Sequence, residues 1–256
     1  MIVPMQSVTV LCLASDRDRA LTALRELGVM HLVPVQVAEG RSLDEGRAAM
    51  AQARRILEVL PVKPGQPPSG QPGEVVVARA TRLLQEKREL ESALDDLRQE
   101  HRRIAPYGDF EPESLLALQA KGVVVKLVQA PLRKAPSVPA GVAIQNVGQD
   151  SASAYYAMVG RAEFSTDAVE LRWPESSKSE LERRIMDMEA KLLANGDALW
   201  AHAGDQAVVL AEAQAAEARL EFLSAREGMG SSTSVAYVKG YAPAESVSSL
   251  KAASAR

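Results

Sequence analysis

The most extended hydrophobic pattern of the chain runs from Glu180 to Arg226. Apolar-leaning positions recur there at alternating steps of four and three, and no proline interrupts them. A spacing that averages about 3.5 residues keeps one stripe of a helix facing a partner helix. At about 1.5 Å per residue, an uninterrupted helix of this kind would be roughly 70 Å long, more than the diameter of a small domain. The pattern therefore predicts one long return helix within residues 175–227, as part of a rod.

The same stepping pattern occurs earlier in the chain, in the outgoing helices of residues 41–106. One helix is predicted over 42–60 and a second over 74–105, where Pro106 ends it. Together they match the return helix in length, so the sequence predicts an antiparallel helical hairpin of coiled-coil type. The residues expected on its seam are Leu83, Leu90, Leu94, Leu97, Ile104, Leu181, Ile185, Met188, Leu192, Leu199, Leu220 and Leu223. In the predicted register Ile104 lies near Leu181, and Leu97 lies near Met188.

The two outgoing helices are separated by a segment rich in proline and glycine, PVKPGQPPSGQPG at residues 61–73. Such a composition cannot form a helix or a central strand, and it predicts a loop or flexible linker. The PxxP spacings could be a ligand for an SH3-type domain, but a polar connector between two helices is the favoured interpretation.

Alternating apolar runs and turn residues predict two small α/β lobes. The first comprises residues 1–40 and 228–256, and the second comprises residues 107–174. The elements predicted in the first lobe are strands at 7–13, 29–35 and 235–238, a helix at 16–27 ended by Gly28, and a last helix from Pro243. Those predicted in the second are a helix from Pro112 to Gly122 and strands at 123–128, 142–147, 153–159 and 167–173. The predicted fold class is α+β, a long antiparallel helical hairpin with a small α/β lobe at each end.

Composition excludes several classes of protein. The single cysteine, Cys12, excludes a disulfide framework. The sequence contains no run of 18 apolar residues, the length needed to span a bilayer. The net charge is −3, and residues 175–227 contain 11 acidic and 6 basic residues. A helical arm that grips RNA would carry a basic face instead, so no nucleic-acid partner is expected.

No catalytic or cofactor-binding site can be assembled from the sequence. His31, His101 and His202 have no further ligand at metal-binding spacing, and no glycine-rich phosphate loop occurs. His101 and His202 fall on the seams, where we expect them as polar layers that fix register. We therefore expect no enzyme, no metal, no cofactor and no small-molecule ligand.

Four aromatic residues are candidates for an interface with another protein, because aromatic side chains supply much interface energy. Tyr107, Phe110 and Trp173 flank the predicted junction of rod and second lobe, and Tyr241 lies in the first lobe. The alternative is that the first three belong to the core of the second lobe.

Two segments resemble a known family. The opening IVPMQSVTVLCLASDRDRALTALRELGVMHLVPV is similar to the start of subunit I of the bacterial and archaeal rotary ATPases, the equivalent of subunit a of eukaryotic V-ATPases. The matching residues are Pro4, Met5, Val8, Leu24, Leu27, Gly28, Val29 and His31. The later segment VAYVKGYAPAESVSSL resembles a strand–turn–helix of the same family through Gly240, Tyr241 and Pro243.

The resemblance implies a non-catalytic stator subunit at the cytoplasmic face of a membrane-bound V-type or A-type rotary ATPase that moves protons or sodium ions. It implies that both lobes hold peripheral stalk subunits E and G, and that the first lobe approaches a central-stalk adaptor of the C/d type. It also implies that a membrane half, which alone would meet the rotor ring, normally follows this region, so we expect the chain to be part of a longer subunit. The alternative is an antiparallel coiled-coil arm of a nucleic-acid-binding or assembly protein.

Overall fold

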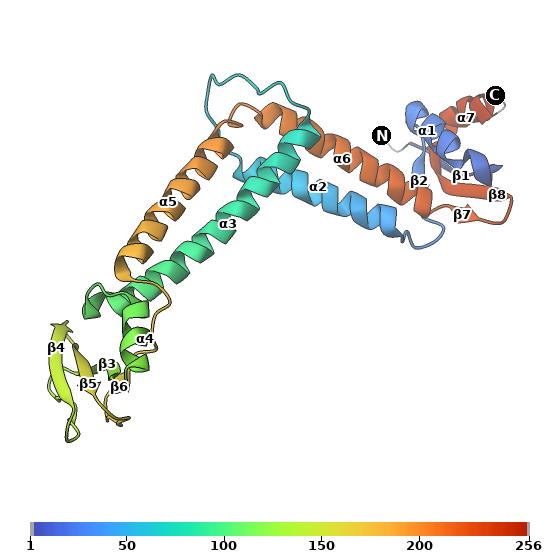
Figure 1. The fold of residues 1–256 in the computed structure, drawn as a ribbon. Coiled ribbons are helices and arrows are strands. Elements are labelled where there is room, and N and C mark those ends of the chain that lie inside the picture. The colour runs from blue at the N-terminus through green and yellow to red at the C-terminus, as the bar shows by residue number, and fades with distance from the viewer. Residues whose placement is uncertain (1–2, 255–256) are drawn as a thin grey trace. The chain divides into compact units, whose positions relative to one another are not determined.

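The computed structural model describes residues 3–254 and confirms an α+β fold. The chain forms two compact units. The first unit contains the residues up to Arg82 together with those from Leu199 onward, and the second contains Leu83–Ala198. Each unit has one antiparallel sheet and a helical part (Figure 1). The two are described separately below.

The sheet of the first unit joins the two ends of the described chain. Its strands are β1 (Met5–Leu13), β8 (Val235–Pro243), β2 (His31–Val33) and β7 (Gly230–Ser231). Their order is β1-β8-β2, and β7 also pairs with β8. The β1–β8 pairing is antiparallel and unbroken, from Met5 opposite Pro243 to Leu13 opposite Val235. The N-terminal and C-terminal segments thus form one lobe.

Helices cover one face of this first sheet. A 3-10 turn, η1 (Ala14–Asp16), leads into α1 (Arg17–Leu27), and η3 (Ala244–Ser246) leads into α7 (Val247–Ser254). Leu21 and Leu24 of α1 and Leu250 of α7 share a core with the alternate β8 residues Ala236 and Val238 (Figure 1). Because strand side chains alternate between faces, the residues between these core positions point to the opposite face of the sheet.

Two predicted boundaries in the first unit were wrong. The strand expected over 29–35 is reduced to His31–Val33. The strand expected over 235–238 extends to Pro243, so the last helical segment begins one residue after Pro243, with η3. Gly28 ends α1 as predicted, with φ of 64° in the left-handed region.

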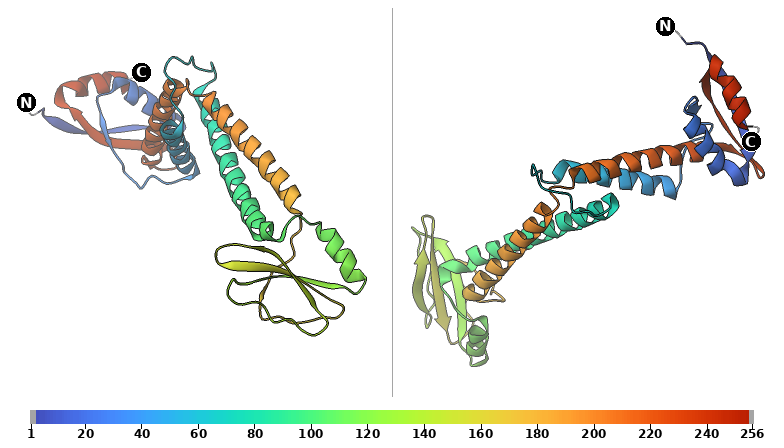
Figure 2. Two further views of the ribbon diagram at one scale, coloured as in Figure 1. Left: turned by 90° about the vertical axis from the view of Figure 1, so that its left-hand side faces the viewer. Right: turned by 90° about the horizontal axis from the view of Figure 1, so that it is seen from above.

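The helical part of the first unit is built on α2 (Arg41–Val59) and α6 (Gln206–Glu227), which run side by side (Figure 2). Arg54 of α2 forms a 2.7 Å ion pair with Glu217 of α6. Gly46 permits close approach, because a Cβ atom there would lie 3.1 Å from Leu223 and 3.4 Å from Leu220. The seam residues of α6 therefore pack against α2.

The prediction of one long return helix was wrong. The segment forms α5 (Lys178–Trp200) and α6, separated by a turn at residues 201–205. The amides of His202 and Ala203 bond the carbonyls three residues earlier, at Leu199 and Trp200, which tightens the end of α5. The heptad spacing runs through this turn without a change of step, so it gave no sign of the break.

The proline-rich segment is also not the free linker that was expected, because it docks on this helix break. The Gln66 side-chain amide donates to the carbonyls of Trp200 and Ala201, at 3.3 and 2.9 Å. A Cβ atom on Gly204 would lie only 2.3 Å from the carbonyl oxygen of Pro67. Glycine is therefore required where the loop crosses the turn.

In the second unit, α3 (Gly73–Ile104), which begins in the first unit, packs against α5 in antiparallel register. Leu97, Ile104 and Leu181 form one buried cluster, and Ile185 and Met188 pack against it. The Arg98–Glu189 ion pair at 2.7 Å and a hydrogen bond between His101 and Glu182 at 3.1 Å flank the cluster.

The sheet of the second unit has the order β4-β5-β3-β6. Its strands are β3 (Val124–Pro131), β4 (Ala143–Gln149), β5 (Ser153–Gly160) and β6 (Val169–Glu170). The 3-10 turn η2 (Ala105–Tyr107) and helix α4 (Pro112–Ala120) connect α3 to it. The strand predicted over 167–173 is thus shortened to two residues, Val169 and Glu170.

Candidate interaction surfaces

No group of three or more His, Cys, Asp or Glu side chains in the described part of the chain could hold a metal ion. The thiol of Cys12 is half-buried and donates weakly to the carbonyl of Ala236 at 3.7 Å. Burial, and then the charge of Asp16, raises the pKa of Cys12, which disfavours the reactive thiolate.

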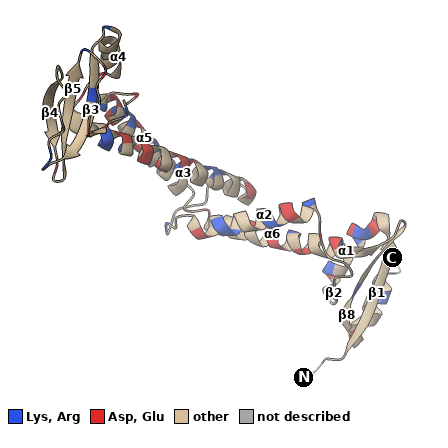
Figure 3. Ribbon diagram, turned by 90° about the horizontal axis from the view of Figure 1, so that it is seen from below, with Lys and Arg blue, Asp and Glu red and all other residues tan. Residues whose placement is uncertain are grey.

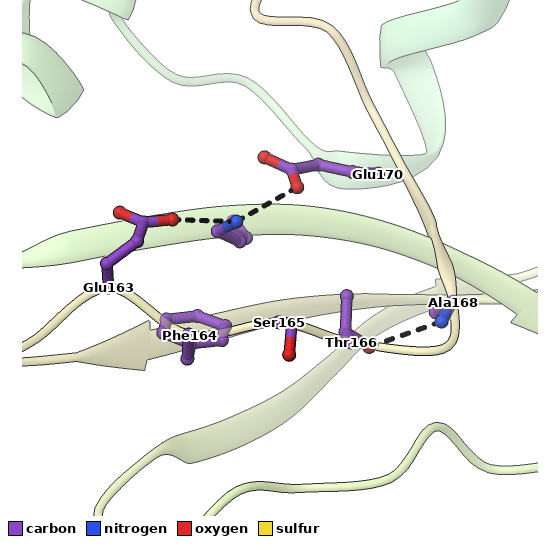
Figure 4. Close-up of a pocket in the computed structure, with 7 residues that line it drawn as sticks. Glu163, Phe164, Ser165, Thr166, Ala168 and Glu170 are labelled. Atoms are coloured by element: carbon purple, nitrogen blue, oxygen red, sulfur yellow. Dashed lines mark hydrogen bonds and ion pairs between the residues drawn. The ribbon is translucent and has the colours of Figure 1, made fainter.

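A shallow hollow of about 460 Å³ lies on the sheet of the second unit, beside β3 (Figure 4). Lys126 lies in it, with its Nζ 2.9 Å from Glu163 and 3.1 Å from Glu170, and above the ring of Phe164. Hydrogen bonds to Glu163 and Glu170 raise the pKa of Lys126 above its usual value. A lysine held in its charged form is a poor nucleophile. The two ion pairs of Lys126 instead connect the 161–170 segment to β3.

Tyr107 is buried rather than available as an interface anchor, which corrects one predicted site. Its side chain is 8% exposed, and its ring meets that of Tyr155 edge-on with centroids 5.3 Å apart. Phe110 is half-buried against the same cluster, and Trp173 is also half-buried. The tyrosine pair is part of the core of the second sheet.

The seam candidates fall into two groups. Leu83, Leu94, Leu97, Ile104 and Leu181 are buried, whereas Leu90, Ile185, Met188, Leu192, Leu199, Leu220 and Leu223 are half-buried. Among the polar seam residues, Asn195 is buried and donates to the Leu83 carbonyl at 3.2 Å. Of these seam residues, Leu97, Ile104 and Leu181 form one buried cluster. Asn195 forms a separate polar layer farther along α5, beside Leu83.

Tyr241 belongs to an uncovered sheet face. We define the outer face of the first sheet by residues that alternate with those in the helix-covered core: Met5, Ser7, Thr9, Leu11, Leu13, His31, Val33, Val235, Tyr237, Lys239, Tyr241 and Pro243. Tyr241 is 50% exposed and Leu11 is 67% exposed. The described helical residues that share a core with this sheet, Leu21, Leu24 and Leu250, lie with Ala236 and Val238 on the opposite face.

The outer face is apolar and slightly basic. It contains Lys239 and His31 but no Asp or Glu. Lys239 places its Nζ 5.9 Å from the centroid of the Tyr237 ring. An open face of this kind fits an amphipathic helix whose apolar stripe has acidic residues beside it.

Helix α4 of the second unit forms another uncovered apolar surface, which the sequence analysis did not identify. None of its nine residues, all of which the structure describes, is buried. Leu116 is 55% exposed, and Leu115 and Leu118 are also accessible. In the run Leu115-Leu116-Ala117-Leu118 the apolar residues are consecutive and do not recur on one face of the helix. This lack of an apolar stripe facing a core was the feature of the sequence that could have indicated the exposure of α4.

The helix break contains a buried ionisable group that the sequence analysis also missed. Asp205 is fully buried, and it accepts hydrogen bonds from the Ser69 amide at 2.6 Å and the His202 imidazole at 2.8 Å. Burial raises the pKa of Asp205, but these hydrogen bonds outweigh it and leave the pKa below its usual value. The Gly-Asp pair at 204–205, a common helix start, was the missed signal.

Comparison with known proteins identifies a relative that is a subunit of a V-type ATP synthase. No family model matches the chain. V-type ATP synthase subunit I 1 of Treponema pallidum (strain Nichols) is 24% identical over 275 residues, covering 96% of this chain and 44% of that protein. The chain therefore spans less than half the length of this curated relative. No helix in the described part has the length and apolar character needed to cross a bilayer.

A solved structure, the cytoplasmic N-terminal domain of subunit I, homolog of subunit a, of V-ATPase, aligns with 97% of this chain and 97% of its own. Its sequence identity is 16% and its TM-score is 0.40. The match to the curated relative confirms the resemblance found at the two ends of the sequence: over nearly its whole length, the chain is similar to subunit I of the V-type ATP synthases.

Proposed function

We propose that this chain is the cytoplasmic part of a non-catalytic stator subunit in a V-type or A-type rotary ATPase. The observation that carries the proposal is the similarity to a V-type ATP synthase subunit I over 96% of the chain. A rotary machine needs static parts that oppose torque. Long packed helices joined to small binding lobes suit such a load better than they suit catalysis.

Two uncovered apolar surfaces support a binding role. One is the outer face of the first sheet, and the other is helix α4 in the second unit. Exposed apolar patches on a folded protein commonly mark protein interfaces. Each unit thus offers one surface on which a partner helix could bury apolar area.

The partners that fit the proposal are the peripheral stalk subunits E and G, which the family resemblance assigns to both lobes. Helical stalk segments match an open sheet face and an exposed helix, because both surfaces can receive an amphipathic helix. A central-stalk adaptor of the C/d type would lie near the first lobe. The chain would then act at the cytoplasmic face of the membrane, as part of the complex.

Native mass spectrometry of the chain mixed with a purified E–G heterodimer tests the proposal. We expect a complex that contains both stalk subunits and this chain. Replacing Leu116 and Leu118 by serine should weaken it, whereas replacing Met186 and Leu193 of α5, which are even more exposed, should not. Absence of any complex at concentrations where the stalk itself remains intact would reject the stator role.

A further inference from the structure

The outer side of α5 has exposed apolar side chains at heptad spacing. Met186 and Leu193 are 70% and 69% exposed, and Trp200, the last residue of the same helix, is 52% exposed. Because successive members are one heptad apart, the three residues lie along one stripe of α5, here called the α5 row. Single exposed apolar residues are common on protein surfaces, but a row of them marks an interaction site.

The α5 row is separate from the seam that packs α5 against α3. Each of its members follows a seam position, Ile185, Leu192 or Leu199, by one residue. One residue corresponds to a rotation of about 100° around an α-helix, so the row lies about that far around α5 from the seam. Helix α3 therefore occupies one side of α5 (Figure 1), and the row is a second apolar side.

A glycine leaves space beside the α5 row. Gly196 is three residues after Leu193 and four residues before Trp200, so it is a neighbour of both on the helix surface. No atom lies within 4 Å of the position that a Cβ atom would take there. Glycine inside a helix is destabilising relative to alanine, and no contact in the described chain requires it at this position. It does allow the backbone of another helix to approach closely.

The charged residues beside the α5 row are mainly acidic. Glu182, Glu189 and Asp197 lie three or four positions from a member of the row, as does one basic residue, Arg183. Glu182 and Glu189 bond residues of α3 but remain 50% and 47% exposed. The exposed carboxylate of Asp197 makes no hydrogen bond or ion pair within the described chain. Although α5 contains both signs of charge (Figure 3), the surroundings of the row are therefore net negative.

These features favour a helix with basic flanks over other occupants. The spacing of the α5 row over two heptads, a length of about 21 Å, matches a partner helix with an apolar stripe of its own. Because the surroundings of the row are net acidic, the same face of a second copy would be repelled, and so would an anionic membrane surface. Lysine and arginine beside a partner's apolar stripe would be attracted.

We propose that the outer side of α5, at Met186 and Leu193, binds an amphipathic helix of another protein, whose apolar stripe is about two heptads long and is flanked by lysine or arginine. The space beside Gly196 receives one of its apolar side chains. This surface is separate from the two proposed for the stalk subunits, and the inference does not depend on the stator role.

Calorimetric titration of synthetic peptides into the full chain tests the proposal. One peptide has leucine at the first and fourth positions of each heptad and lysine beside them, and a second has glutamate in place of lysine. We expect the lysine peptide to bind the wild type about tenfold more tightly than the glutamate peptide, or more. Asp197→Lys should reduce this preference by about fivefold or more, because it reverses a charge beside the row.

Two variants test whether the peptide binds at the α5 row. Leu193→Asp should weaken binding by about tenfold or more, because apolar contact is lost. Gly196→Leu should weaken it by about fivefold or more while raising the melting temperature, because leucine is a better helix former than glycine. A variant that lost affinity through a damaged fold would melt earlier instead. Val37→Asp, at an exposed loop position outside the row, is the control and should bind as the wild type does.

Several results would overturn the proposal. They are no binding of the lysine peptide at about 1 mM, equal binding of the two peptides, and unchanged affinity in Leu193→Asp or Gly196→Leu. A wild-type dimer in sedimentation velocity that Leu193→Asp dissociates would assign the row to a second copy instead. Co-sedimentation of the chain with vesicles containing phosphatidylserine, if lost in Leu193→Asp, would assign it to a membrane surface.

Discussion

The main-chain amide of Ser69 donates a 2.6 Å hydrogen bond to Oδ1 of the fully buried Asp205. The other carboxylate oxygen of Asp205 accepts from Nδ1 of His202, in the tautomer that protonates this nitrogen, at 2.8 Å. One side chain at the start of α6 therefore ties the proline-rich loop to the turn that ends α5. This contact joins residues 136 positions apart in sequence.

Removing the Asp205 carboxylate should release the loop. Asp205→Ala leaves the Ser69 amide without its acceptor, so we expect a loss of about 1–3 kcal/mol in the free energy of unfolding. Hydrogen exchange at the Ser69 amide should accelerate. Asp205→Asn keeps an oxygen acceptor for Ser69 and should be milder, and the exposed Asp95→Ala is the control for loss of an acid. Unchanged exchange at Ser69 in Asp205→Ala would show that the hydrogen bond does not hold the loop.

Two glycines give opposite predictions for the same substitution. Gly204→Ala would place a Cβ atom 2.3 Å from the Pro67 carbonyl, so the loop must move and the melting temperature should fall. Gly196 lies inside α5 with nothing near its missing Cβ, so Gly196→Ala should stabilise the protein by about 0.5–1 kcal/mol. Thermal denaturation followed by circular dichroism compares the two variants. A shift of the same sign for both would contradict the docked loop.

The cluster around Ile104 should be the most sensitive part of the α3–α5 packing. Ile104 is fully buried, and Ile104→Ala should cost about 2–5 kcal/mol through lost burial and a residual cavity. Leu193→Ala, on the exposed side of α5, should change stability by less than about 0.5 kcal/mol. Chemical denaturation of both variants measures the difference. Equal, small effects would mean that the two helices do not pack through this cluster.

Burial, reinforced by Tyr155, raises the pKa of Tyr107 from 10.0 to about 12. Because the folded state holds this proton more tightly than the unfolded state, stability should fall as pH rises from about 10 to about 12. Absorbance titration of the five tyrosines should show a late phase that becomes smaller in Tyr107→Phe. Part of that phase should remain, because the hydrogen bond to Asp150 also raises the pKa of Tyr155. A titration of the wild type that is complete near pH 10 would contradict the buried position of Tyr107.

Periodicity predicted the helices well because their cores are one-sided. The alternation of Leu97, Ile104, Leu181 and Met188 carries both the helical period and the antiparallel register, so the α3–α5 packing followed from local pattern. The break at residues 201–205 did not, because it depends on Gly204 and Asp205 meeting a loop far away in sequence. A heptad count cannot register a contact that a distant segment makes.

The solvent exposure of individual side chains was the other property that could not be predicted from the sequence. Tyr107 and Tyr241 are the same residue type near element ends, yet one is packed against Tyr155 and the other lies on an open sheet face. Which face helices cover depends on how the β1–β8 pairing brings α1 and α7 to one side. The exposure of α4 could have been inferred only from its lack of an inward stripe.

Calorimetric titration of the purified E–G stalk heterodimer into the full chain tests the stator account most directly. We expect binding by the wild type, and weakening by about tenfold or more in a variant with Leu11 and Tyr241 replaced by serine and in one with Leu116 and Leu118 replaced, because each loses buried apolar contacts. The combined variant, folded by circular dichroism, should not bind. Full affinity in that combined variant, or no binding by the wild type, would contradict the account.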